Sequence, residues 1–162
     1  MEFLNKWRNA AKYLDDSFAP GKYSFEYVFA ISMAGQPLAW MEASNLPAEA
    51  FDIKPVVDTY RSVSADFHAG VILPVGEEPS GRSWTGFQSI SSDKEGYMII
   101  YREATSRAEE FVRTWLPDGS KVKFVPVIGH GKAFTAKVER NGEIRFALPD
   151  QNDYVMYKYE IR

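Results

Sequence analysis

The run of residues 36–47 holds the densest mixture of side chains that could contact a ligand. Its apolar residues are interspersed with Gln36 and Glu42, and Trp40 lies between them. Such a mixture is typical of the mouth of a cavity, where apolar walls carry a few polar groups. The run also fits a loop whose serine and asparagine side chains hydrogen-bond the backbone, and both interpretations stay open.

Glycoside chemistry requires two acids held about 5 to 9.5 Å apart across a sugar. A self-contained glycosidase would use Glu42 with a second acid, but most of the other acids fall on predicted solvent faces. The sequence also has no G-x-S-x-G motif for a nucleophilic serine. We therefore assign no catalytic residue, and we expect the chain alone to lack activity.

The two histidines, His68 and His130, lie far apart in the sequence, and there is no cysteine. Zinc sites need several His, Cys or carboxylate ligands at short spacing, so neither a metal site nor a cofactor is predicted. His68 falls at the end of a predicted helix, where the helix dipole favours a cation. His130 lies between two glycines in a turn between predicted strands, so it is expected to be an exposed loop residue and not part of a phosphate-binding loop.

The composition is that of a soluble globular protein, because 45% of the 162 residues are hydrophobic and 25% are charged. The net charge of −3 and the lack of a basic stripe argue against a nucleic-acid partner. The sequence shows no apolar run that could span a membrane and no signal peptide, so no membrane partner is expected. It does not fix a compartment, although a natural start at Met1 predicts a cytoplasmic protein.

Two segments of the N-terminal half have apolar patterns that favour helices. Residues 3–16 have apolar side chains at i, i+3, i+4 and i+7, which predicts a helix that must pack on another element. Residues 24–35 fit either a helix or a strand. We favour a helix there, because apolar residues occur at both odd and even positions.

Residues 48–68 form the clearest amphipathic pattern of the chain. Pro55 suits the first turn of a helix, so the helix is expected to begin near Ile53 or Lys54. Gly70 suits the residue that follows the helix, where the left-handed conformation is common.

From Val71 onward, the chain reads as short strands separated by turns. Asp118-Gly119 and Asn141-Gly142 predict hairpin turns, because these residue pairs tolerate positive φ angles. Residues 97–101 are apolar at every position, which predicts a central strand that is covered on both faces. An extended segment over residues 71–76 precedes seven expected strands, which cover residues 84–91, 97–103, 110–116, 121–128, 133–139, 143–148 and 154–161.

These patterns predict a mainly β fold with N-terminal helices. Several short antiparallel strands at this spacing favour a β-sandwich of about seven to eight strands. We expect two domains, a helical segment over residues 1–75 and an antiparallel β-sandwich over residues 76–162.

Several stretches resemble the C-terminal region of glycoside hydrolases of the α-galactosidase (melibiase, family 36-like) type. The run 36–47 resembles the last part of their (β/α)8 barrel, and residues 53–61 resemble the closing helix of that barrel. The stretches similar to the β-sandwich that follows the barrel are residues 70–76, 84–88, 96–103, 142–149 and 154–161.

The resemblance implies that the chain is a non-catalytic part of a longer hydrolase. In that family, two aspartates on earlier barrel strands are the nucleophile and the acid/base, so the resemblance carries no catalytic residue onto this chain. It implies the catalytic barrel of the parent enzyme as a partner, with Gln36, Trp40 and Glu42 at the rim of the sugar site. Without its barrel, the apolar face of the helical segment would be exposed, so self-association is expected.

A carbohydrate-binding module is the alternative function. Aromatics make up 15% of the chain, and exposed rings can stack on a sugar. The candidate rings are Trp84, Tyr97, Tyr101 and Trp115. We favour the interpretation that they fill the sandwich core, because aromatic side chains bury large areas.

Overall fold

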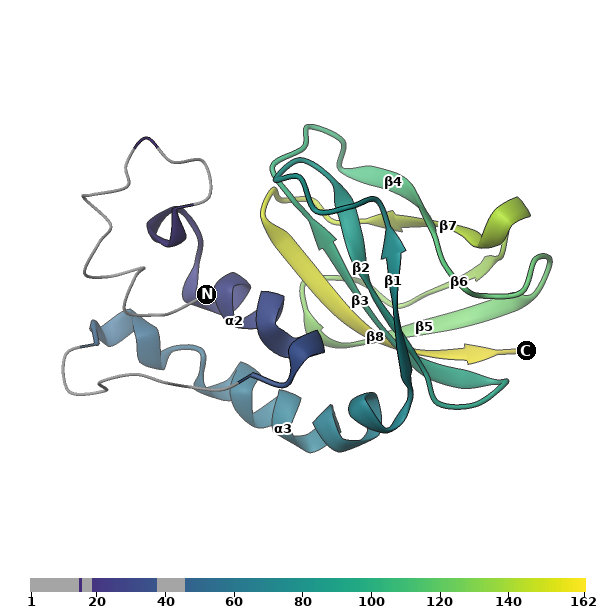
Figure 1. Cartoon of the computed structure of the whole chain (residues 1–162), viewed down its shortest axis with the longest axis horizontal. Coiled ribbons are helices and arrows are strands. Elements are labelled where there is room, and N and C mark those ends of the chain that lie inside the picture. The colour runs from purple at the N-terminus through teal and green to yellow at the C-terminus, as the bar shows by residue number, and fades with distance from the viewer. Residues whose placement is uncertain (1–14, 16–18, 38–45) are drawn as a thin grey trace. The chain divides into compact units, whose positions relative to one another are not determined.

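The structure is a computed structural model that describes residue 15, residues 19–37 and residues 46–162 (Figure 1). The predicted helix over residues 3–16 lies outside this part, except for Asp15. The chain divides into two compact units, and the division lies between Ser62 and Val63. None of the helices within the described ranges is long and apolar enough to cross a membrane.

The described part of the N-terminal half is helical, with α2 at Phe25–Ser32 and α3 at Lys54–Ala69. The helix favoured over residues 24–35 is therefore confirmed. Ser24 caps α2, because its side-chain oxygen accepts a hydrogen bond from the backbone N–H of Tyr27 at 3.1 Å. Short 3-10 helices occur at Pro20–Lys22, Met33–Gly35 and Ala48–Phe51.

Helix α3 begins at Lys54 with Pro55 in its first turn, as the sequence predicts. The helix ends at Ala69 and Gly70 follows it, as predicted, although the φ angle of Gly70 is not positive. The chain passes directly from the helix into the first strand. Gly70 is needed there for space, since a Cβ atom would lie 2.3 Å from Ser89 Oγ.

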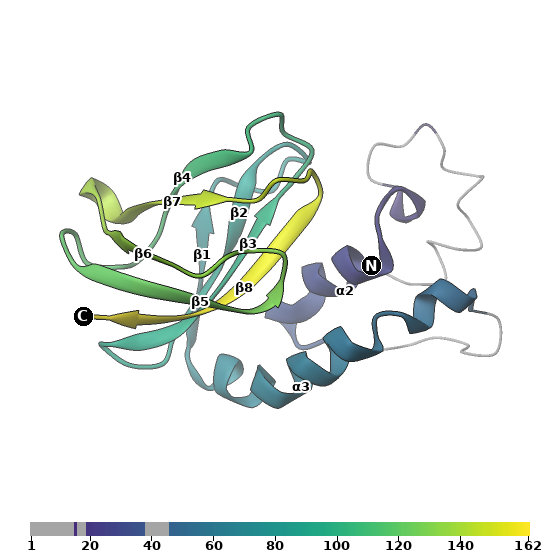
Figure 2. The same cartoon turned by 180° about the vertical axis from the view of Figure 1, so that it is seen from behind.

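Eight antiparallel strands follow and form two sheets (Figures 1 and 2). The larger sheet has the order β1-β2-β3-β8-β5-β6, and β4 pairs with β7 on one side of it. The predicted β-sandwich with N-terminal helices is thus confirmed. The strands are β1 (Val71–Gly76), β2 (Trp84–Ile90), β3 (Glu95–Arg102), β4 (Glu109–Arg113), β5 (Lys121–Gly129), β6 (Phe134–Lys137), β7 (Glu143–Ala147) and β8 (Asp153–Ile161).

The hydrophobic core of the β unit contains residues from both sheets. Alternate residues of β7 and β8 face it, as the period-two patterns predict. On β8 these are Val155, Tyr157 and Tyr159, and on β7 they are Ile144 and Phe146. Trp84 of β2 is also part of this core and is 1% exposed.

Strand β3 lies between β2 and β8, and its residues from Gly96 to Arg102 are all buried. The central, doubly covered strand predicted over residues 97–101 is confirmed. Met98 and Ile100 face the core. On the other face, the Tyr97 ring lies 6.3 Å from the Phe67 ring of α3.

The two predicted turns adopt the expected backbone angles but are not hairpins. Gly119, Asn141 and Gly142 have φ angles of 78°, 63° and 74°. The first turn joins β4 to β5 and the second joins β6 to β7. Strand β4 does not pair with β5, and β6 does not pair with β7. The hairpin prediction is wrong, because each turn carries the chain from one sheet to the other.

The end of α3 and strand β1 both belong to the compact β unit. Strand β1 pairs with β2 along its whole length, from Val71 opposite Ile90 to Gly76 opposite Thr85. The division between compact units therefore lies before the expected domain boundary at residues 75 and 76. The expected division into domains at residues 75 and 76 stays a prediction.

Candidate functional sites

Of the residues predicted to line a sugar site, only Gln36 lies within the described residues. Gln36 is exposed and follows the short 3-10 helix Met33–Gly35 as its C-cap. Its backbone is in the left-handed conformation, with a φ angle of 58°. Trp40 and Glu42 lie outside the described residues. The predicted rim therefore stays a prediction.

The four candidate sugar-stacking aromatics separate into two groups. Trp84, Tyr97 and Tyr101 are buried, as the core interpretation predicts. Trp115 is 57% exposed. Of these four rings, Trp115 is therefore the one exposed enough to stack on a ligand.

Trp115 lies in a groove of about 510 Å³ on the β unit, which we call the Trp115 groove. Polar groups of Arg113, Asp118 and Asn141 share the groove with the indole ring. The remaining lining comes from Pro74, Val75, Gly76, Thr114, Leu116, Pro117 and Gly142. The groove therefore combines one large exposed ring with a cation, a carboxylate and an amide.

Trp115 is held by one hydrogen bond from its ring and one from its backbone. Its indole Nε1–H donates to the carbonyl of Pro74 at 2.8 Å, and its backbone N–H donates to Gln88 Oε1 at 2.9 Å. The Gln88 side chain is buried and also donates to the Tyr159 hydroxyl at 3.1 Å. Burial raises the pKa of Tyr159, and the hydrogen bond from Gln88 lowers it to a smaller extent.

Asp118 fixes the opposite wall of the groove. Its carboxylate accepts hydrogen bonds from the backbone N–H groups of Asn141 at 3.2 Å and Gly142 at 2.8 Å. Thr114 Oγ1 donates to the carbonyl of Gly142 at 2.6 Å. The turns that join β4 to β5 and β6 to β7 are thereby tied together beside Trp115.

A second cavity of about 510 Å³, the Lys132 pocket, lies where the two sheets meet at another edge. Its walls come from the loop after β5 and from strands β4, β6, β7 and β8. The lining residues are Ala108, Glu109, His130, Lys132, Phe134, Arg145, Ala147, Pro149 and Tyr157.

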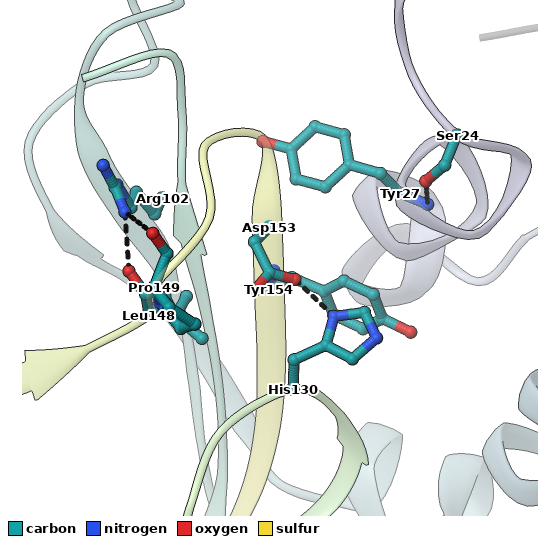
Figure 3. Close-up of polar contacts among 8 residues, drawn as sticks. All are labelled: Ser24, Tyr27, Arg102, His130, Leu148, Pro149, Asp153 and Tyr154. Carbon is teal, nitrogen blue, oxygen red and sulfur yellow. Dashed lines mark hydrogen bonds and ion pairs between the residues drawn. The ribbon is translucent and has the colours of Figure 1, made fainter. Parts of the chain in front are cut away.

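His130 is 62% exposed, so the prediction of an exposed loop residue is confirmed. The sequence did not predict its partner. His130 Nδ1 lies 2.6 Å from Oδ1 of the buried Asp153, and the second ring nitrogen points away from that carboxylate (Figure 3). The same Oδ1 accepts the backbone N–H of Tyr154 at 2.8 Å.

Tyr157 forms part of the inner wall of the Lys132 pocket. Its hydroxyl donates to the backbone carbonyl of Lys132 at 3.2 Å. Burial raises the pKa of Tyr157 to about 12, so the hydroxyl stays protonated and keeps this hydrogen bond at neutral pH.

Neither cavity has the donor set of a metal site. Within residues 19–37 and 46–162, no three His, Cys, Asp or Glu side chains converge to hold a metal ion. Comparison with protein-family models, curated proteins and solved structures gives no match to this chain.

Proposed function

We propose that the chain is a non-catalytic C-terminal region of a glycoside hydrolase of the α-galactosidase type. Support comes from where the resembling stretches lie in the fold. Residues 70–76 contain β1, residues 84–88 lie in β2, residues 96–103 contain most of β3, and residues 154–161 contain most of β8. These four strands are neighbours in one sheet, and the fifth sandwich-like stretch, residues 142–149, contains β7 of the two-stranded sheet.

The proposed role of the β unit is to hold the last helix before the sandwich in place. Ser89 Oγ of β2 donates to the backbone carbonyl of Phe67 at 2.6 Å, and this carbonyl lies in the last turn of α3. The Phe67 side chain is fully buried beside Tyr97. The sheet thus contacts the end of helix α3 through one buried hydrogen bond and one aromatic contact.

We expect the purified chain to leave aryl α-galactosides unhydrolysed, with rates equal to those of a buffer control. In the proposed enzyme class the two acids lie on earlier barrel strands, and the resemblance assigns neither of them to a residue of this chain. Release of nitrophenol over time would be followed at several protein concentrations. Turnover that scales with protein concentration and survives a second purification would contradict the proposal.

Carbohydrate binding at the Trp115 groove is a second candidate function, and the exposure of Trp115 favours it. An indole face carries partial negative charge, so the C–H groups on the apolar face of a sugar ring can pack against it. Arg113, Asp118 and Asn141 supply donors and acceptors for the sugar hydroxyls. The two hydrogen bonds that hold Trp115 reduce the entropy lost on binding.

Replacing Trp115 with alanine is expected to weaken oligosaccharide binding at least about tenfold, or about 1.4 kcal/mol. Binding would be measured by isothermal titration with α-galactosyl oligosaccharides and with β-linked glucans as a comparison set. Phe111→Ala is the matched control, because Phe111 is a 52% exposed aromatic of β4 that does not line the groove.

Flat titrations of the unmodified chain with both sugar sets would exclude this second function. Equal weakening by Trp115→Ala and Phe111→Ala would place the sugar outside the Trp115 groove. Neither result depends on the hydrolysis assay, so the two candidate functions are tested separately.

A further inference from the structure

The Lys132 pocket is not used by either proposed function. Its lining includes the apolar rings of Phe134 and Tyr157. It also includes the cationic side chains of Lys132 and Arg145. These cations are notable in a chain whose net charge is −3. The pocket is therefore a place where a ligand with both apolar and anionic parts could be recognised.

The loop that carries Lys132 is held closely against β8. Gly129 has a φ angle of 86°, and a Cβ atom there would lie 2.3 Å from the carbonyl oxygen of Tyr154. At Gly131, a Cβ atom would lie 2.3 Å from the Tyr157 hydroxyl. The Gly129-His130-Gly131 motif is thus explained by close packing of the loop on β8.

Two hydrogen bonds complete the attachment of this loop. Asp153 holds His130 at one end, and the Tyr157 hydroxyl binds the backbone carbonyl of Lys132 at the other. The backbone of Lys132 is therefore fixed before any ligand arrives, which lowers the cost of ordering the site.

Of the two cationic side chains that line the pocket, Lys132 is the one available to pair with an anionic ligand. Arg145 forms an ion pair with Glu109 of β4. Asp153 is buried beside His130. Among the described residues, no carboxylate lies within 4.0 Å of the Lys132 ammonium.

The inner wall of the pocket is aromatic. The half-buried Phe134 ring and the buried Tyr157 ring lie 5.6 Å apart in an edge-to-face arrangement. Phe134 also stacks on Phe124 of the core at 4.7 Å, which fixes its orientation. A flat apolar group bound there would contact rigid rings, and its apolar surface would be removed from water.

We propose that the Lys132 pocket binds a small organic carboxylate whose flat apolar body lies against Phe134 and Tyr157. The carboxylate pairs with the Lys132 ammonium. The cavity of about 510 Å³ is in the size range of small-molecule sites. This inference does not rest on the glycoside hydrolase proposal or on the Trp115 groove.

The test uses 2-naphthoate as the probe and the uncharged naphthalene-2-carboxamide as its control, followed by amide chemical shifts of the whole chain. We expect saturable shifts in residues 129–134 and in β7. The carboxamide should bind more weakly by a factor of about 2 to 5, which is the range for a partly exposed charge pair.

Lys132→Gln should weaken 2-naphthoate binding by the same factor of about 2 to 5 and leave carboxamide binding unchanged. The substitution keeps the backbone carbonyl that Tyr157 uses. Lys137→Gln is the matched control, because Lys137 is an exposed lysine of β6 outside the pocket. It should leave both affinities unchanged.

Three results would each overturn the inference. The first is an absence of saturable shifts around the pocket at the solubility limit of 2-naphthoate. The second is equal affinity for the acid and the amide. The third is unchanged 2-naphthoate affinity in a Lys132→Gln variant whose amide spectrum shows that it is folded.

Discussion

Replacing Arg102 with methionine is expected to lower the free energy of unfolding of the β unit by about 2 to 4 kcal/mol. Arg102 ends β3 and is only 4% exposed. Its Nη1 donates to the carbonyls of Leu148 and Pro149 at 2.7 and 2.6 Å (Figure 3). Its Nε and Nη2 donate to the carbonyl of Thr105 at 3.3 and 2.8 Å.

These hydrogen bonds explain the size of the expected effect. Methionine fills most of the volume but donates no hydrogen bond, so the carbonyls of Leu148 and Pro149 lose the guanidinium as donor. The Thr105 carbonyl keeps the side-chain amide of Gln151 at 3.1 Å. A buried carbonyl without a partner, as at Leu148, costs about 1 to 3 kcal/mol, and the part-buried carbonyl of Pro149 costs less because water can reach it. Relief from burying the guanidinium offsets part of that cost.

The measurement is urea unfolding followed by far-ultraviolet circular dichroism at the β-sheet band. Arg162→Met is the matched control, because Arg162 ends the chain with an exposed side chain paired to Glu160. Its free energy of unfolding should change by less than about 0.5 kcal/mol. Equal effects of the two substitutions would mean that the Arg102 hydrogen bonds do not stabilise the fold.

The positions of the strands could be predicted from the sequence because each strand carries its burial pattern locally. Alternation on β7 and β8, and the unbroken apolar run of β3, are properties of consecutive residues. The order of the strands is not local. The placement of β8 between β3 and β5 joins segments more than 20 residues apart, and no turn signal specifies it. This is also why the Asn141-Gly142 turn was wrongly predicted to be a hairpin.

Trp115 could have been separated from the buried aromatics by its position in the local alternation. Val112, Thr114 and Leu116 are buried, while Trp115 shares the outward positions with Arg113. This period-two signal extends past the end of β4 and was present in the sequence.

The Lys132 pocket could not have been predicted in the same way. His130 and Asp153 are 23 residues apart in the sequence, and they meet only because β5 pairs with β8. Phe134, Arg145 and Glu109 come from three further strands. A site assembled from the edges of two sheets depends on the sheet order, which single-sequence patterns do not contain.

Replacing Trp84 with alanine is expected to lower the free energy of unfolding by about 3 to 5 kcal/mol, the range for removing a large buried aromatic. Trp84 begins β2, is 1% exposed, and donates its indole N–H to the carbonyl of Arg107 at 3.1 Å. Alanine leaves a cavity in the core between the sheets. It also removes the hydrogen bond that ties the loop before β4 to β2.

Trp115→Ala is the matched control for Trp84→Ala, because the same side chain is removed from a 57% exposed position. Its loss should cost about 1 kcal/mol, mainly from the hydrogen bond to the carbonyl of Pro74. Urea unfolding of both variants directly tests the assignment of Trp84 to the core and of Trp115 to the surface. If Trp115→Ala destabilised the β unit as much as Trp84→Ala, Trp115 would be a core residue, and carbohydrate binding at the Trp115 groove would lose its main support.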